Sequence, residues 1–250
     1  MKYEIYIPGE SMNDAGRALT GMMEDEKHGV SFADMIRLRL SGAVSDQCTD
    51  TYFAAHQDGF CYSRLWHGWG KHENAIGNFG NFFTLEGYRG KGVGKEMMKL
   101  WLQDITTRED LPVGLFCTSR LVTLNYFYRP VGFRPAIRGK EAGPLYLPLG
   151  DSPETFQQFC EKYYQPSDFL ISRPATVQYR HEIDCLLRFA FVDMGKDVAI
   201  GDLQKMEEAL LYFPGRARML FTEDGRCVGW QADGITRVHP QYESTKIEIE

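Results

Sequence analysis

The sequence lacks the spacing by which a metal centre or a redox pair is recognised. Its six cysteines lie far apart, at positions 48, 61, 117, 160, 185 and 227, and none belongs to a C-x-x-C pair. Zinc sites and redox pairs place their ligands or thiols a few residues apart. We therefore expect no metal in this protein.

Long apolar stretches are absent as well. No run approaches the roughly 20 residues that cross a bilayer. The N-terminal residues MKYEIYIPGE do not contain the apolar core of a signal peptide. These absences favour a cytoplasmic protein without a membrane partner, and a reducing cytoplasm agrees with the scattered cysteines.

An excess of positive charge is also missing. The net charge is −6, so we expect no general attraction to nucleic acid. The modest negative field favours an amine or another cationic acceptor. The chain has 250 residues, of which 43% are hydrophobic and 25% charged, and this suits one large globular domain or two smaller ones.

The most informative stretch runs from Asn81 to Thr106. Asn81 to Leu85 is aromatic and β-branched, which predicts a short strand, and Gly87 to Gly94 is a turn rich in glycine and cations. A helix follows, because the next apolar residues share one face: Val93, Met97, Leu100, Trp101 and Ile105.

A strand, a glycine loop and a helix in this order suit an anion such as phosphate. Gly90, Gly92 and Gly94 allow the backbone to curl with its N–H groups inward, and the first turn of a helix adds further N–H groups. Three cations accompany them: Arg89, Lys91 and Lys95. The P-loop does not fit, because Glu96 follows Lys95, and the dinucleotide loop does not fit, because the glycines run G-x-G-x-G.

What does fit is the R/Q-x-x-G-x-G/A pyrophosphate loop of the GNAT family of N-acetyltransferases, which residues 89–94 match at every specified position. Residues 115–119 resemble that family's next strand. Tyr128, Gly132 and Phe133 then match its Y-x-x-x-G-F motif. Two positions depart from the pattern. Glu86 replaces the usual proline, and Leu121 stands where the family often has an asparagine that helps hold the cofactor; Asn125 is nearby but is not the matching residue.

The resemblance implies a GNAT-like α/β (α+β) fold over residues 1–150, with a mixed, mostly antiparallel sheet, splayed central strands and flanking helices. It also implies an acetyltransferase that uses acetyl-CoA as co-substrate and transfers its acyl group directly to an amine. Tyr128 matches the residue that protonates the leaving thiolate. The residues expected to bind the cofactor are Thr84, Leu85, Arg89, Gly90, Lys91, Gly92, Val93, Gly94 and Lys95.

Several points stay open at this level. The acceptor is a small-molecule or peptide amine, and the sequence does not rank four candidates for the base: His67, His72, Glu73 and Glu86. Cys117 invites a covalent intermediate, but a cysteine in a strand is more often a small buried hydrophobe. One alternative is a sensor that binds acyl-CoA without catalysis. Another is an interaction protein on a GNAT scaffold, in which the loop is an ordinary turn.

The first half also contains elements before the glycine loop. We expect a strand over Tyr3 to Ile7, two helices before residue 40, and a hairpin about Asp58-Gly59, a dipeptide that supplies the positive φ values of a tight turn. The segment WHGWGKHENAIGNF follows. Its two tryptophans, Trp66 and Trp69, either line an acceptor pocket or cap the sheet from a loop.

The glycines and prolines between Arg138 and Pro153 indicate a boundary, so residues 151–250 form a smaller α+β domain. Ser152 and Pro153 suit the start of a helix. Asp58-Gly-Phe-Cys61 and Asp224-Gly-Arg-Cys227 agree at three of four positions, which indicates either a partial GNAT-like repeat over 168–250, without its own cofactor loop, or merely two common hairpins. Such a region would be structural, would shape the acceptor site or would form a homodimer.

Overall fold

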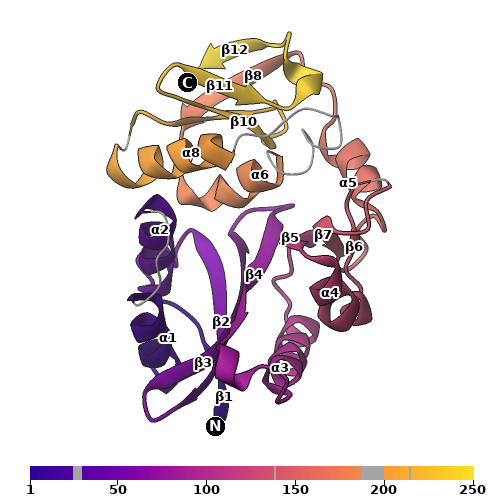
Figure 1. Ribbon diagram of the computed structural model, residues 1–250. Helices are drawn as coiled ribbons and strands as arrows, with labels where there is room; N and C mark the ends of the chain where they lie inside the picture. The colour runs from indigo at the N-terminus through magenta and orange to yellow at the C-terminus, as the bar shows by residue number, and fades with distance from the viewer. Residues whose placement is uncertain (25–29, 138, 187–199, 214) are drawn as a thin grey trace.

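The computed structural model describes residues 1–24, 30–137, 139–186, 200–213 and 215–250. They form two sheets, which Figure 1 shows one above the other. The larger sheet has seven strands in the spatial order β1 (Lys2–Tyr6), β2 (Cys48–Gln57), β3 (Phe60–Gly70), β4 (Ile76–Thr84), β5 (Gly114–Ser119), β7 (Gly143–Pro148) and β6 (Arg134–Pro135). All neighbours are antiparallel except β4 and β5.

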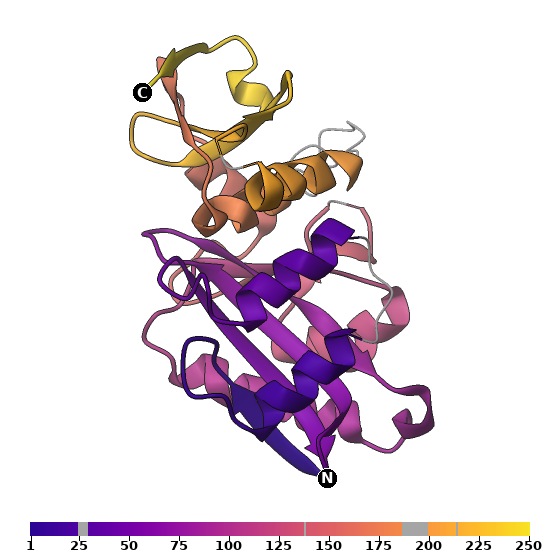
Figure 2. The ribbon, with the colours of Figure 1, turned by 90° about the vertical axis from the view of Figure 1, so that its left-hand side faces the viewer.

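Helices cover both faces of this sheet. α1 (Asp14–Glu24) and α2 (Val30–Leu40) lie across one face, as Figure 2 shows, and α3 (Val93–Thr107) packs on the other. Each face has its own apolar core, the first around Leu19 and Tyr52 and the second around Phe79 and Trp101. After β5 the chain forms the short α4 (Leu121–Thr123) and a π-helical turn over Leu124–Tyr128.

The smaller sheet belongs to the C-terminal part of the chain. Its spatial order is β11 (Ile235–Val238), β10 (Cys227–Ala232), β9 (Arg218–Phe221), β8 (Phe169–Pro174) and β12 (Lys246–Ile249). Its helices are α5 (Phe156–Tyr163), α6 (Arg180–Cys185) and α8 (Ile200–Tyr212). The expected mixed, mostly antiparallel first sheet with flanking helices and the α+β C-terminal part are both confirmed.

Two local predictions were wrong. The segment after the hairpin is mostly strand, because β3 continues to Gly70 and β4 starts at Ile76. The N-cap of α5 is Thr155 and not Ser152. The Thr155 hydroxyl accepts from the Gln158 backbone N–H, and the Gln158 side-chain oxygen accepts from the Thr155 backbone N–H, which together form a capping box. The predicted hairpin is confirmed, with φ of 53° at Asp58 and 77° at Gly59.

The C-terminal elements follow the same order as the first half of the larger sheet. Among the described residues of both, a strand, two helices and three further strands follow one another, and the four strands are neighbours in sequence order. Each hairpin has a register shift directly after its cysteine, and Cys61 Sγ contacts the Ser63 carbonyl as Cys227 Sγ contacts that of Gly229, at 3.3 and 3.9 Å. The partial repeat remains a prediction that this parallel supports.

The C-terminal part packs on the end of β3 through the 3₁₀ turn Val177–Tyr179. A Cβ added to Gly70 would lie 1.9 Å from the Gln178 carbonyl oxygen, so the two backbones touch here. Gln178 Nε2 donates to the Lys71 carbonyl at 2.6 Å, and the Tyr179 ring stacks on His72 at 4.5 Å. The contact therefore depends on the absence of a side chain at position 70.

An ion pair between His72 and Glu182 joins the two parts and predicts a pH dependence. Burial alone would lower the pKa of His72, but the hydrogen bond and charge of Glu182, 2.9 Å away, outweigh burial and raise that pKa above its ordinary value. The pair therefore stabilises the fold most below about pH 6.5, and this contribution is lost as the pH rises through the raised folded-state pKa. We expect His72→Gln to lower the melting temperature at pH 6 more than at pH 9. An equal loss at both pH values would contradict this expectation.

Candidate functional site

The central feature of the larger sheet is a gap between β4 and β5. The two strands pair only at their first residues, where Ile76, Gly77 and Asn78 face 114–116. β4 then bends away, because an extra residue interrupts its register with β3 and Asn81 adopts a φ of 53°. Asparagine tolerates this left-handed conformation better than most residues. Beyond Asn78, this edge of β4 pairs with no strand in the described part of the chain.

A glycine loop follows the free end of β4. Gly90 and Gly92 have φ values of 73° and 81°, and a Cβ added at either would meet nothing within 4 Å. Gly92 is the N-cap of α3 and caps it with no side chain. Within the described residues, the backbone N–H groups of residues 90–94 donate to no other part of the chain. The loop thus presents several free donors and open space at the start of a helix.

The other predicted cofactor residues lie around this loop. Thr84 ends β4, and Arg89 Nε donates to the Thr84 carbonyl at 2.9 Å, so this arginine braces the loop against the strand. The Leu85 N–H donates to the Tyr62 carbonyl at 2.9 Å. Val93 is buried in the core, and only its backbone faces the loop. The remaining cations, Lys91 and Lys95, are exposed.

Gly94 serves a different purpose from the two glycines before it. Its backbone is ordinary for a helix, but a Cβ here would lie 3.2 Å from Phe127 and 3.3 Å from Phe82. The absence of a side chain therefore lets the first turn of α3 approach two aromatic rings. Gly94 thus allows α3 to pack closely on Phe82 and Phe127.

Tyr128 lies behind the gap, at the end of the π-helical turn. Its ring packs edge-on against Phe79 of β4 at 5.4 Å and tilted against Phe133 at 5.6 Å. Burial, with a smaller effect of the neighbouring Cys117, raises the pKa of Tyr128 above its ordinary range. Burial likewise raises the pKa of Cys117. Both groups are therefore protonated at neutral pH, and Cys117 is not an activated nucleophile.

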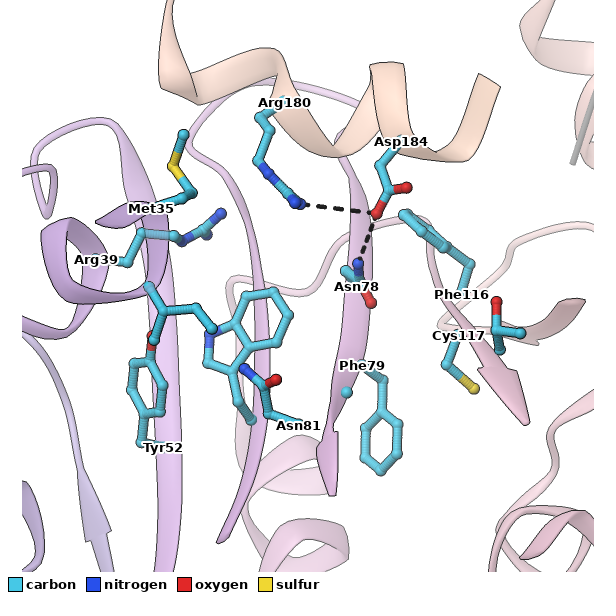
Figure 3. A pocket seen from close by; sticks show the side chains of 14 residues that line it. Met35, Arg39, Tyr52, Asn78, Phe79, Asn81, Phe116, Cys117, Arg180 and Asp184 are labelled. Carbon is cyan, nitrogen blue, oxygen red and sulfur yellow. Dashed lines mark hydrogen bonds and ion pairs between the residues drawn. The ribbon is translucent and has the colours of Figure 1, made fainter. Parts of the chain in front are cut away.

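A cavity of about 210 Å³ opens on the other face of the gap. β4 and β5 form its floor, and the side chains on its walls come from α2, β2, β3 and α6 (Figure 3). Its apolar lining consists of Met35, Ile36, Tyr52, Trp66, Phe79 and Phe116, and its polar lining includes Arg39, Asn78, Asn81, Thr118, Arg180 and Asp184. The unpaired edge of β4 thus runs from the aromatic cavity, which residues 78–81 line, toward the glycine loop that follows Thr84.

The wall on the α2 side is a buried ion pair. Arg39 Nε lies 2.9 and 3.0 Å from the two carboxylate oxygens of Asp50, and Trp66 Nε1 donates to the same carboxylate at 2.7 Å. Arg39 Nη1 lies 2.6 Å from His181 Nε2. Burial, followed by the charge of Arg39, lowers the pKa of His181 well below its ordinary value. His181 is therefore neutral and can accept this hydrogen bond.

The opposite wall is α6, whose six residues are all buried although four of them are polar or charged. Arg180 pairs with Glu207 of α8 through Nε at 3.0 Å and through Nη2. Its Nη1 lies 3.7 Å from Asp184, which also accepts from Asn78 Nδ2 at 3.0 Å. The C-terminal part therefore contributes charged groups directly to a cavity of the first sheet.

None of the four candidate bases lines this cavity. His67 faces α3 on the other side of the sheet, where Trp101 Nε1 donates to its Nδ1 at 3.0 Å, and burial lowers its pKa well below the ordinary value. His72 is engaged by Glu182, while Glu73 and Glu86 are exposed. Of the two tryptophans considered for an acceptor pocket, Trp66 lines the cavity and Trp69 packs in the α3 core.

The sequence interpretation missed the charged residues of the cavity. Arg39 could have been found, because it lies on the same helical face as the apolar Met35 and Ile36, where a cation is unusual. Asp184 and Arg180 gave no such signal, since an i, i+4 pair of opposite charges is common on exposed helices. Only the packing of the two sheets shows that this pair is buried.

No protein-family model matches this sequence, and no curated protein is significantly similar to it. Solved structures with a similar fold do exist. Escherichia coli ElaA is 14% identical, with a TM-score of 0.42, and the match covers 58% of this chain and 97% of ElaA. An acyl-CoA N-acyltransferase from Pseudomonas aeruginosa is also 14% identical, with a TM-score of 0.42 and coverage of 59% and 99%.

A third similar structure is a GNAT family acetyltransferase from Brucella melitensis in complex with acetyl-CoA. It is 16% identical, with a TM-score of 0.39, and the match covers 61% of this chain and 92% of that protein. These likenesses concern the fold and span nearly the whole length of each relative. Further similar structures include a GNAT family acetyltransferase from Staphylococcus aureus, which is 14% identical, with a TM-score of 0.39 and coverage of 60% of this chain and 100% of that protein. In the part of the chain that the structure describes, no helix is long and apolar enough to cross a membrane, and no three side chains form a metal-binding group.

Proposed function

We propose that this protein is an acyl-CoA-dependent N-acyltransferase, which most simply transfers acetyl from acetyl-CoA to an amine. One observation carries the proposal: the unpaired edge of β4 connects a loop of free N–H groups with an aromatic cavity. A molecule with an anionic end and an extended arm can bind the loop and pass between the strands. An acceptor can then meet its reactive end from the cavity.

The loop suits the pyrophosphate of coenzyme A. Positive φ at Gly90 and Gly92 would let the backbone N–H groups of residues 90–94 turn toward a bound anion, and the α3 dipole would add the equivalent of about half a positive charge. Open space about both glycines leaves room for phosphate oxygens. Lys91 and Lys95 would add charge at the rim, while Arg89 would keep the loop in place on Thr84.

When bound, acetyl-CoA would supply an acyl thioester at the gap. Tyr128 would then donate its phenolic proton to the leaving sulfur, because its raised pKa keeps that proton in place at neutral pH. The free edge of β4 beyond Asn78 would offer backbone N–H groups to the oxygen that gains charge when the amine attacks. No covalent intermediate on Cys117 is needed, and burial keeps that thiol protonated.

Thermal unfolding with and without acetyl-CoA tests the proposed site. At about a hundred times its dissociation constant, the ligand should add about 2.7 kcal/mol of stability, which corresponds to about 5–10 °C in melting temperature for a chain of this size. Gly92→Glu should abolish the shift, because it places a carboxylate where phosphate should bind. Gly92→Ala is the matched control, since it carries the same positive φ strain without the charge, and it should retain most of the shift.

The outcomes separate this proposal from its rivals. Stabilisation of the wild type together with release of free CoA when an amine is added supports the acyltransferase. Stabilisation without release under any amine would favour a sensor that binds acyl-CoA. If millimolar acetyl-CoA does not stabilise the wild type, both readings fail, and an interaction protein on the same fold remains.

A further inference from the structure

We infer that the acceptor carries a carboxylate beside its amine, as an amino acid does, and that Arg39 and Arg180 bind this carboxylate. The inference rests on the proposed acyltransferase function and adds a substrate class to it. Both arginines line the cavity, Arg39 from α2 and Arg180 from α6. Figure 3 shows their side chains reaching toward the same space from the two helices.

Arg39 has donors that the described residues do not use. Its Nη2 is buried and forms an ion pair with Asp50 Oδ1 at 2.8 Å, but it makes no hydrogen bond. The side chain is only 3% exposed. A buried donor without an acceptor is costly, and an oxygen atom bound in the cavity would satisfy it.

Arg180 offers a second donor group. Glu207 engages its Nε and Nη2, which leaves Nη1 facing the cavity at an ion-pair distance of 3.7 Å from Asp184. Each guanidinium is thus held in place by a carboxylate, Asp50 or Glu207, at the lining of the cavity. Guanidinium groups held in this way recognise carboxylates with little loss of side-chain entropy.

The rest of the lining fits a small zwitterion with an apolar side chain. The cavity volume of about 210 Å³ is below the roughly 300–1,000 Å³ of pockets for drug-sized ligands. Trp66, Phe79 and Phe116 provide apolar contact, and the Asp184 carboxylate accepts from the Asn78 amide where the α6 wall meets β4. An amine without a carboxylate would leave Arg39 Nη2 without a hydrogen-bond acceptor.

The test compares amino acids with the amines that lack only their carboxylate. Release of CoA from acetyl-CoA is measured with each of the natural α-amino acids and with its decarboxylated amine, for example L-phenylalanine with 2-phenylethylamine and L-leucine with 3-methylbutylamine. We expect at least one amino acid to be acylated with a kcat/KM at least about tenfold above that of its amine, since hydrogen bonds to a charged group are lost in the amine.

Variants identify the residues. Arg39→Lys and Arg180→Lys keep the positive charge beside Asp50 and Glu207 but remove the forked donors of the guanidinium. The ratio of kcat/KM for the amino acid to kcat/KM for its amine should therefore fall toward one, mainly because KM for the amino acid rises. Arg37→Lys is the matched control, because Arg37 lies on the same helix with its side chain 50% exposed, and it should keep the preference. Melting temperatures of all three variants show whether the fold is intact.

Two results would overturn the inference. One is acylation of a decarboxylated amine as fast as its amino acid, and the other is no acceleration by any amino acid in a protein that acetyl-CoA stabilises. Both leave the cofactor site standing. If acetyl-CoA does not stabilise the wild type, the acyltransferase proposal itself is wrong, and this result differs from both of those above.

Discussion

Replacing Tyr128 with phenylalanine is expected to lower turnover by about two to four orders of magnitude, the usual contribution of a general acid. The substitution removes only the hydroxyl, so the ring contacts with Phe79 and Phe133 remain. Binding of acetyl-CoA, measured by calorimetry or thermal shift, should change little. A loss in kcat without a loss in cofactor affinity identifies a group that acts on the leaving sulfur.

A nearby tyrosine provides the control for this experiment. Tyr126 lies two residues earlier on the same turn but is 76% exposed, so Tyr126→Phe should leave turnover unchanged. The raised pKa of Tyr128 adds a second criterion. Its proton should stay in place above the ordinary tyrosine value of about 10, so turnover should not fall between pH 7 and 9 through loss of this acid. A decrease of less than about threefold for Tyr128→Phe would mean that another group or water protonates the thiolate.

The second large effect is expected at the contact between the two sheets. Gly70→Ala places a methyl group 1.9 Å from the backbone oxygen of Gln178 and 2.8 Å from the His72 ring. A backbone oxygen cannot rotate away as a side chain does, so the 3₁₀ turn must shift. Overpacking typically costs about 1–3 kcal/mol, and we expect the upper end, which corresponds to about 6–12 °C in melting temperature.

The cavity should respond to the same substitution. α6 follows directly after the displaced turn, so moving the turn moves Arg180 and Asp184 away from β4. Gly21→Ala is the matched control, because a Cβ at this helical position meets nothing within 4 Å, and alanine favours a helix by about 1 kcal/mol over glycine. If Gly70→Ala and the wild type have equal melting temperatures, the contact between β3 and the 3₁₀ turn can be broken without a loss of stability.

The sequence predicted the elements whose signals are local. The hairpin at Asp58 and Gly59 and the helix from Val93 follow from turn chemistry and apolar spacing, and the structure has both. The gap between β4 and β5 was predicted only from the family resemblance. Nothing in residues 76–84 by themselves indicates where the pairing of β4 with β5 ends. The left-handed Asn81 that bends β4 is recognisable only once its partner strand is known.

The errors have a common physical origin in tertiary packing. His67 appeared as a candidate base because it lies close in sequence to His72 and Glu73. It points into the α3 core, since successive strand residues face opposite sides of a sheet. α6 shows the same limit more strongly. Its sequence, RHEIDC, has the polarity of an exposed turn. Its buried polar side chains find their partners far away in the sequence, since His181 contacts Arg39 and Arg180 pairs with Glu207.

The position of α6 also bears on how acceptor specificity can evolve. The loop proposed to hold the cofactor is a short continuous segment, residues 89–94, whereas one wall of the cavity comes from a helix encoded far downstream. Substitutions in that helix can therefore change the choice of acceptor without altering the loop or β4. On the repeat hypothesis, a duplicated half-domain without a cofactor loop supplies this wall. Relatives that share residues 76–133 but differ in 180–185 should then share a donor and diverge in their acceptors.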